Sequence, residues 1–231
     1  MKEMNAMNAA DNQNRNLPAG IQDFEKLREL GYVYVDKTEY VYKLVKTSIP
    51  FFLSRPRRFG KSLLLSTLRA YWEGKKELFK GLAIEQLEKN NPDTFNPYPV
   101  FYFDFNGENY ENTPVEEVLD QHLSGWEKIY GDRYRDGNPG YRFERLLEMA
   151  AEMTGRHCAV LADEYDKPLL DTMEDQHRAA HTQAVLKGFF SRLKKADDFI
   201  RFIFITGVTR LNEVSLFSDV DQLRDISLSA D

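Results

Sequence analysis

Apolar residues along the chain follow two patterns, short continuous runs and longer stretches with helical spacing. Short runs rich in aromatic and β-branched residues are typical of strands buried on both faces. Such runs cover residues 49–53, 99–105, 157–162 and 199–206, and a fifth strand is expected to begin within 225–228. Apolar residues three or four positions apart predict helices over 23–30, 38–45, 61–74, 115–129, 143–153 and 176–195. Strands that alternate with helices predict an α/β domain whose parallel sheet is covered on both faces.

The first predicted helix is followed by a typical C-terminal boundary residue, and the second begins at a typical N-cap residue. The start of the chain shows no helical or strand pattern. Gly31 is expected to end the first helix and Thr38 to cap the second. Residues 1–16 are rich in Asn, Ala and Met and lack a secretory h-region, so they predict a flexible tail before a domain over 17–231. No apolar run approaches the roughly 18 residues of a membrane span. We therefore expect a cytoplasmic protein without membrane contact.

Composition and charge limit the classes of partner. The 231 residues are 42% hydrophobic and carry a net charge of −6, so a nucleic-acid partner would need a local basic patch. Cys158 is the only cysteine and lies in an apolar run, which predicts a buried, unreactive thiol. Trp72 and Trp126 lie in helical patterns and are expected to pack in the interior.

The segment Arg-Pro-Arg-Arg-Phe-Gly-Lys-Ser at residues 55–62 lies between a predicted strand and a predicted helix. Backbone N–H groups of a tight loop that leads into a helix N-terminus bind phosphate. Lys61 has the position that reaches the β- and γ-phosphates, and the Ser62 hydroxyl has the position that ligates Mg²⁺. Arg55 stands where the phosphate-loop pattern has its first glycine, and Pro56 keeps it extended. The predicted ATP contacts are Arg57, Arg58, Phe59, Gly60, Lys61, Ser62 and Leu63.

The third predicted strand ends in two adjacent carboxylates. Asp163 is the predicted Mg²⁺ ligand together with Ser62, since an acid at a strand end holds the ion in P-loop enzymes. Glu164 is the predicted residue that orients or deprotonates the attacking water. Asp166 is a third candidate acid in the following loop. Asp104 is a rival for the metal role, although it stands within its strand and has no acidic neighbour.

The fourth predicted strand ends in Thr-Gly-Val-Thr-Arg at residues 206–210. Thr206 is the candidate that senses the γ-phosphate or holds the water. Arg210 is the candidate that neutralises charge in the transition state, together with Lys61. The alternative is that Thr206 merely ends a strand and that Arg210 pairs with Glu213 or Asp219 at the surface.

Several segments together resemble the prokaryotic AAA-ATPase-like family. They are Leu17–Phe24 (LPAGIQDF), Tyr34–Thr38 (YVDKT), the loop at 55–62, Ala162–Asp166 (ADEYD) and the segment at 206–210. The resemblance implies a P-loop NTPase of the additional-strand type, with a central, mostly parallel five-stranded sheet flanked by helices. It also implies that Arg55 is the family's own variant, and that Tyr34 or Val35 lies near the adenine; packing of Tyr34 is the favoured alternative. Longer relatives continue into a nuclease-like C-terminal domain, which this chain is expected to lack.

Three functions follow as hypotheses. The first is Mg²⁺-dependent ATP binding and hydrolysis, coupled to a partner or to the absent C-terminal domain, which is also where nucleic acid is expected to bind. The second is a nucleotide-dependent switch or scaffold that does not hydrolyse ATP. The third is direct nucleic-acid binding through Arg55, Arg57 and Arg58, which would weaken steeply with salt. The sequence leaves the oligomeric state open.

Overall fold

The computed structural model describes residues 16–208 and 223–227 of the chain. The chain divides into two compact units. The first comprises Met1–Lys46 and Ser62–Asn96, and the second comprises Thr47–Lys61 and Pro97–Asp231. The tail expected over residues 1–16 lies outside the described residues except for Asn16. None of the described helices is both long enough and apolar enough to cross a membrane.

The second unit contains a five-stranded parallel sheet in the order β2-β3-β4-β1-β5. The strands are β1 (Phe51–Ser54), β2 (Val100–Asp104), β3 (Cys158–Asp163), β4 (Ile200–Gly207) and β5 (Arg224–Asp225). The first four lie where apolar runs predict them, with ends that differ by one or two residues, and β5 begins one residue before the range expected for a fifth strand. A parallel sheet flanked by helices confirms the predicted α/β class. Because β4 lies between β1 and β3, the segments after these three strands meet at one edge of the sheet.

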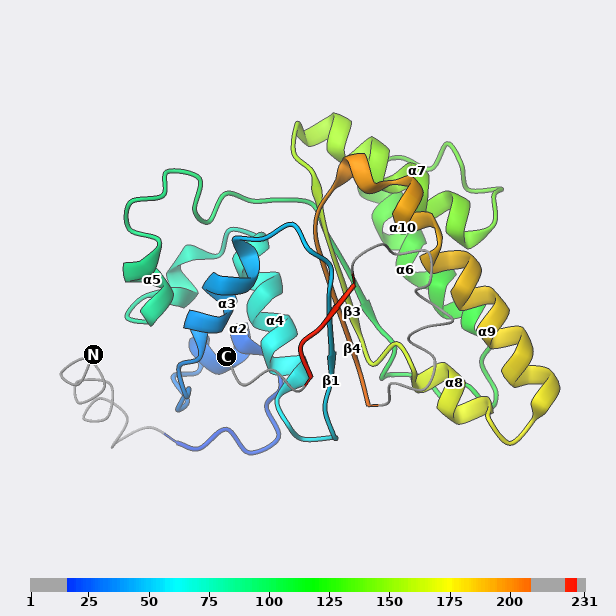
Figure 1. The fold of residues 1–231 in the computed structure, drawn as a ribbon, viewed down its shortest axis with the longest axis horizontal. Coiled ribbons are helices and arrows are strands. Elements are labelled where there is room, and N and C mark those ends of the chain that lie inside the picture. Colours follow the sequence, from blue (N-terminus) through cyan, green and yellow to red (C-terminus); the bar gives the residue numbers. More distant parts are fainter. Residues whose placement is uncertain (1–15, 209–222, 228–231) are drawn as a thin grey trace. The chain divides into compact units, whose positions relative to one another are not determined.

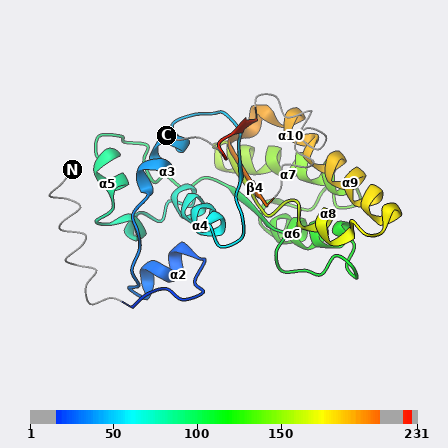
Figure 2. The ribbon, with the colours of Figure 1, turned by 60° about the horizontal axis from the view of Figure 1, so that its bottom comes forward.

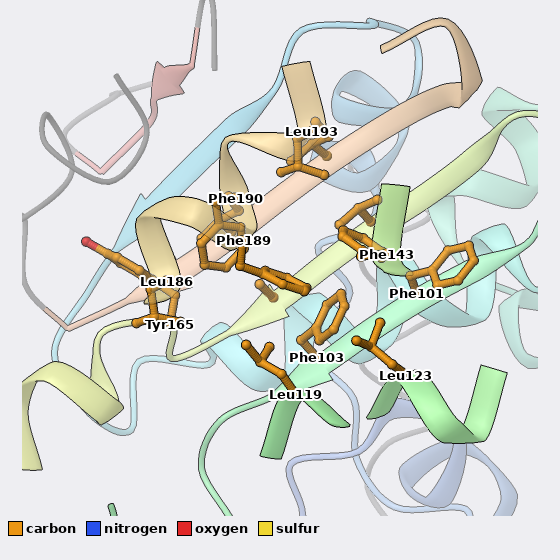
Figure 3. Close-up of a cluster of buried hydrophobic side chains, with 14 of the residues drawn as sticks. Phe101, Phe103, Leu119, Leu123, Phe143, Tyr165, Leu186, Phe189, Phe190 and Leu193 are labelled. Atoms are coloured by element: carbon orange, nitrogen blue, oxygen red, sulfur yellow. The ribbon is translucent and has the colours of Figure 1, made fainter. Parts of the chain in front are cut away.

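Helices of the second unit cover one face of this sheet (Figure 1). They are α6 (Val115–Tyr130), α7 (Pro139–Thr154), α8 (Lys167–Thr172), α9 (Gln176–Phe190) and α10 (Arg192–Lys195), with a 3-10 turn, η2, at Asp197–Phe199. Aromatic rings fill the space between these helices and the sheet (Figure 3). Phe103 of β2 meets Phe143 of α7 and Phe189 of α9 edge to face, and Phe143 and Phe189 stack on each other.

Three features of these helices differ from the predictions. The helix predicted over 176–195 is divided at Ser191, whose side chain donates a hydrogen bond to the Gly188 carbonyl. The helix predicted to begin at Phe143 begins at Pro139, because the Asn138 side chain accepts from the Tyr141 N–H and proline suits the first turn. Helix α8 was not predicted.

The first unit is helical in its described part. Its elements are α2 (Phe24–Glu29), α3 (Thr38–Val45), α4 (Lys61–Trp72, whose first residue belongs to the second unit), η1 (Lys76–Phe79) and α5 (Ala83–Leu87). Thr38 is not the cap predicted for α3: the Asp36 carboxylate accepts from the Thr38 N–H, and the Thr38 hydroxyl accepts from the Ile84 N–H. Tyr34 is buried against Phe24, as the packing alternative predicts, whereas Val35 is exposed.

Candidate functional site

The loop at residues 55–60 connects β1 to α4 and has an unusual backbone. Arg58 and Gly60 have positive φ values of 68° and 78°. Arg57, which precedes them, and Phe59, which lies between them, do not have positive φ. Alternation of this kind points successive backbone N–H groups into one concavity, which favours an anion. Arg58 has a positive φ, whereas Arg55, at the position of the pattern's first glycine, does not. The side chains of Arg57, Arg58 and Phe59 are exposed.

The Lys61 side chain folds back over this loop. Its Nζ donates to the carbonyl oxygens of Arg55 at 3.0 Å and Pro56 at 3.4 Å, and lies 3.6 Å from Oε1 of Glu164. The Lys61 side chain is only 3% exposed, so its charged end is buried beside the loop.

Asp163, Glu164 and Thr206 are joined by one buried hydroxyl. The Thr206 hydroxyl donates to Oδ1 of Asp163 at 2.6 Å and accepts from the Glu164 N–H at 3.2 Å. The Thr206 carbonyl accepts from the Tyr165 N–H at 3.0 Å. Thr206 thus fixes the direction of the Asp163 carboxylate and the start of the segment after β3.

Glu164 is held in a strained and poorly solvated state. Its φ of 50° is in the left-handed region, which a glutamate seldom adopts. Burial raises the pKa of Glu164, whereas the charges of Lys61 and Arg57 lower it and that of Asp163 raises it. A carboxylate whose pKa is moved toward neutrality is a better proton acceptor at physiological pH than an ordinary glutamate.

Asp166, the third candidate acid, has a structural partner. Its Oδ2 accepts from the Val208 N–H at 2.9 Å, which ties the loop after β3 to the end of β4. Gly207 is a residue that the sequence analysis did not single out, and a Cβ there would lie 2.7 Å from Cε1 of Tyr165 and 3.0 Å from Oδ1 of Asp166. A glycine at the end of a buried strand was the available signal of this close approach.

Replacement of Gly207 by alanine is expected to lower the free energy of unfolding by about 1–3 kcal/mol, because the added methyl group overlaps the Tyr165 ring. Gly125→Ala is the matched control, since nothing lies within 4 Å of its Cβ position in α6 and alanine should stabilise the helix by about 1 kcal/mol. Urea denaturation of both variants measures the difference. Equal effects would show that the loop after β3 does not press on Gly207.

The remaining predicted residues are placed as follows. Asp104 of β2 is the register partner of Asp163 of β3. Asp104 is exposed, and its Oδ1 accepts a hydrogen bond from the Asn106 N–H. Ser62 and Leu63 follow Lys61 in the first turn of α4, in the first unit. Arg210 lies outside the described residues. The structure therefore brings together Lys61, Asp163, Glu164 and Thr206.

Cys158, Trp72 and Trp126, which are predicted to have only packing roles, lie in the interior or pack on other rings. Burial raises the pKa of the Cys158 thiol to about 12, so it remains protonated and inert. Trp72 is buried, and Trp126 packs on the rings of Phe101 and Phe103.

Comparison with known proteins gives two matches. The model of a family described as "Predicted AAA-ATPase" matches residues 18–217. A protein of Azotobacter chroococcum mcd 1, described as "Uncharacterized protein in vnfD 5'region", is 36% identical over 218 residues. That alignment covers 94% of this chain and 42% of the relative, so the chain spans less than half of the relative's length. No solved structure matches the chain.

Proposed function

This chain belongs to the predicted AAA-ATPase family, and we propose that it binds ATP with Mg²⁺ at the loop of residues 55–61 and hydrolyses it. Membership in the family suggests nucleotide binding. The observation that carries the proposal is that the loop after β1 and the carboxyl ends of β3 and β4 bring together Lys61, Asp163, Glu164 and Thr206. The position of β4 between β1 and β3 supports the additional-strand class of P-loop proteins.

The phosphates bind the loop and Lys61. Positive φ at Arg58 and Gly60 turns backbone N–H groups toward a bound anion, and the buried Lys61 ammonium adds a full charge. The charge of Arg57 lowers the pKa of Glu164, which supports a role for this arginine near the same anion. Excess positive charge in the loop is thus neutralised by the ligand, and this accounts for arginines where other phosphate loops carry small residues.

Asp163 fits a magnesium ligand. Mg²⁺ prefers carboxylate oxygens and bound water, and Thr206 holds the Asp163 carboxylate in one direction at the strand end. The ion would neutralise charge on the β- and γ-phosphates. That Ser62 also ligates Mg²⁺ stays a prediction, as does the role of Arg210 in the transition state.

Glu164 acts as general base. The oxygen of a water molecule bonds to the γ-phosphorus while the bond from phosphorus to the bridging oxygen of ADP breaks, and the proton of the water passes to the Glu164 carboxylate. Thr206 is the proposed sensor of the γ-phosphate. Its hydroxyl contacts both the Asp163 carboxylate and the Glu164 N–H, so a shift of this side chain would move both acids. We further propose that this cycle drives a partner or another part of a longer protein.

A switch that binds ATP without hydrolysing it is the second candidate function. The contact of Lys61 with Glu164 favours it, because a carboxylate paired with a cation accepts a proton less readily.

Release of phosphate from ATP tests the proposal. The chain is expected to release phosphate with MgATP and not with ATP and EDTA, and Asp163→Asn should lower the rate at least about 100-fold because the metal contact loses its charge. Asp132→Asn, an exposed site in the loop before α7, is the control. Binding of MgATP without phosphate release would favour the switch, and absence of both would contradict the proposal.

A further inference from the structure

A cavity of about 490 Å³ lies in the second unit, at the amino ends of the central strands. This volume falls within the range of roughly 300–1,000 Å³ that is usual for ligand sites. Helix α7 leads into β3, and α10 followed by η2 leads into β4; α7 and α10 lie side by side (Figure 2). Tyr98 precedes β2, His157 precedes β3 and Arg201 is the second residue of β4. The other lining residues, at the end of α7 and directly after it, are Thr154, Gly155 and Arg156.

This cavity is far from the candidate nucleotide site, which lies at the carboxyl ends of the same strands. At about 3.3 Å per residue along β4, Arg201 and Thr206 are roughly 16 Å apart. None of the lining residues belongs to the candidate nucleotide site. Ligands of open parallel sheets ordinarily bind at the carboxyl ends of the strands. A ligand in this cavity would therefore be a second one, separate from the proposed nucleotide.

The lining of the cavity is positively charged. It contains two arginines and a histidine, and none of its six residues is acidic. The Arg156 guanidinium lies over the Tyr98 ring, 5.2 Å from the ring centroid. Within residues 16–208 and 223–227, Arg156 forms no ion pair with a carboxylate. The ring contact orients this guanidinium but leaves its full charge in place.

The second guanidinium, that of Arg201, is held by the segment before β1. Its Nη1 donates to the Thr47 carbonyl at 3.3 Å and to the Ser48 hydroxyl oxygen at 2.9 Å. Both acceptors are neutral, so these two bonds orient the guanidinium without cancelling its charge. Two cations oriented at one cavity repel each other, and an anion bound between them would replace this repulsion with attraction.

The end of α7 opposes an anion, but less strongly than the arginines attract one. A helix C-terminus carries about half a negative charge, whereas the two guanidiniums carry a full positive charge each. Part of the helix end is also satisfied within the chain. The Thr154 hydroxyl donates to the Ala150 carbonyl at 2.7 Å, and the Gly155 N–H donates to the Ala151 carbonyl at 2.9 Å. The net charge at the cavity therefore favours an anion.

We propose that this cavity binds the phosphate group of a small phosphomonoester. The forked N–H donors of a guanidinium match phosphate oxygens, and the His157 imidazole offers a further N–H. A phosphomonoester carries about −1.5 to −2 charges at pH 7, which matches the charge of the two arginines. A phosphodiester or a single carboxylate carries only half as much. The site gives the protein a means to respond to a phosphorylated small molecule, and it does not depend on the proposed ATPase activity.

Nuclear magnetic resonance of the histidine imidazoles in the 231-residue chain tests the site, with methyl phosphate as the probe. We expect a saturable shift of the His157 resonances, which His157→Gln assigns, and no response of the other three histidines, which lie outside the cavity. Arg156→Gln and Arg201→Gln should each weaken binding at least about tenfold, because each removes charge-assisted hydrogen bonds. Arg133→Gln, an exposed arginine outside the cavity, is the matched control and should bind as the wild type does.

Two further ligands separate the phosphomonoester from weaker alternatives. Dimethyl phosphate, with a single charge, should bind at least about tenfold more weakly than methyl phosphate. Sodium chloride at equal ionic strength should give no saturable shift. The proposal would be overturned if His157 showed no saturable response to methyl phosphate, or if either of these two ligands matched it. Undiminished binding in both arginine variants, with circular dichroism showing that they are folded, would also overturn it.

The loop at 55–61 is a second place where phosphate could act, and Lys61→Ala separates the two. The His157 response should persist in this variant, because Lys61 does not line the cavity. Loss of the response would show that the probe acts through the loop and would contradict the site. Because the titration contains no ATP, failure of the proposed ATPase function would leave its result unchanged.

Discussion

Replacement of Glu164 by glutamine is expected to lower the rate of ATP hydrolysis about 10²–10⁴-fold while MgATP binding is kept. The amide has the size of the carboxylate but cannot accept a proton from water. Lys61 retains its contacts with the loop carbonyls of Arg55 and Pro56, so the phosphate site is preserved. Single-turnover phosphate release measures the rate, and calorimetry measures the affinity. Glu152→Gln, on an exposed face of α7, is the control.

The same variant has an expected effect on stability. Because burial raises the pKa of Glu164, the folded state favours the neutral carboxyl, and this contribution is lost as the pH rises through the folded-state pKa. At neutral pH without nucleotide, Glu164→Gln should therefore be more stable than the wild type, and the difference should shrink as the pH is lowered. A variant that hydrolyses ATP at the wild-type rate would remove Glu164 from the mechanism.

Replacement of Arg142 by methionine is expected to lower the free energy of unfolding by about 3–5 kcal/mol. Arg142 of α7 donates to both carboxylate oxygens of Glu127 of α6, at 2.7 and 2.9 Å, and to Asp120 at 2.6 Å. Arg142 and Glu127 are both almost fully buried. The variant would leave the Glu127 carboxylate buried without its cation, so urea denaturation should show a large shift of the midpoint.

The control for this prediction removes both charges. Arg142→Met together with Glu127→Leu should recover most of the lost stability, because no unpaired buried charge remains. Asp120 is half exposed and can be solvated in either variant. A loss below about 1 kcal/mol in the single variant would show that water reaches Glu127 and that the ion pair contributes little.

Strands β1 to β4 could be predicted from the sequence because each is a run of mostly apolar residues, whereas β5 is Arg224–Asp225 and carries no such run. Such a run marks its own position, whatever its neighbours are. Helix α8 (Lys167–Thr172) could not be predicted in this way, because its apolar residues, Pro168, Leu169 and Leu170, are consecutive and show no spacing of three or four. The division at Ser191 and the start at Pro139 depend on single hydrogen bonds at helix ends, which spacing does not reveal.

The meeting of Lys61, Asp163, Glu164 and Thr206 could be expected because each lies at or after the carboxyl end of a predicted strand, and the carboxyl ends of parallel strands lie at one edge. Their separate roles stay predictions. The backbone of Arg58 could not be predicted, since residue type disfavours the left-handed region for arginine. The contact of Asp166 with Val208 likewise depends on how closely the loop after β3 approaches β4.

Thermal unfolding with and without MgATP tests the nucleotide site most directly. MgATP at about 100 times its Kd should stabilise the wild type by roughly 2.7 kcal/mol, which for a chain of this size raises Tm by about 5–10 °C. Lys61→Ala should lose this rise, and Lys128→Ala, an exposed lysine of α6, should keep it. A wild type that shows no rise in millimolar MgATP, or a Lys61→Ala variant that keeps it, would contradict the nucleotide site proposed for this loop.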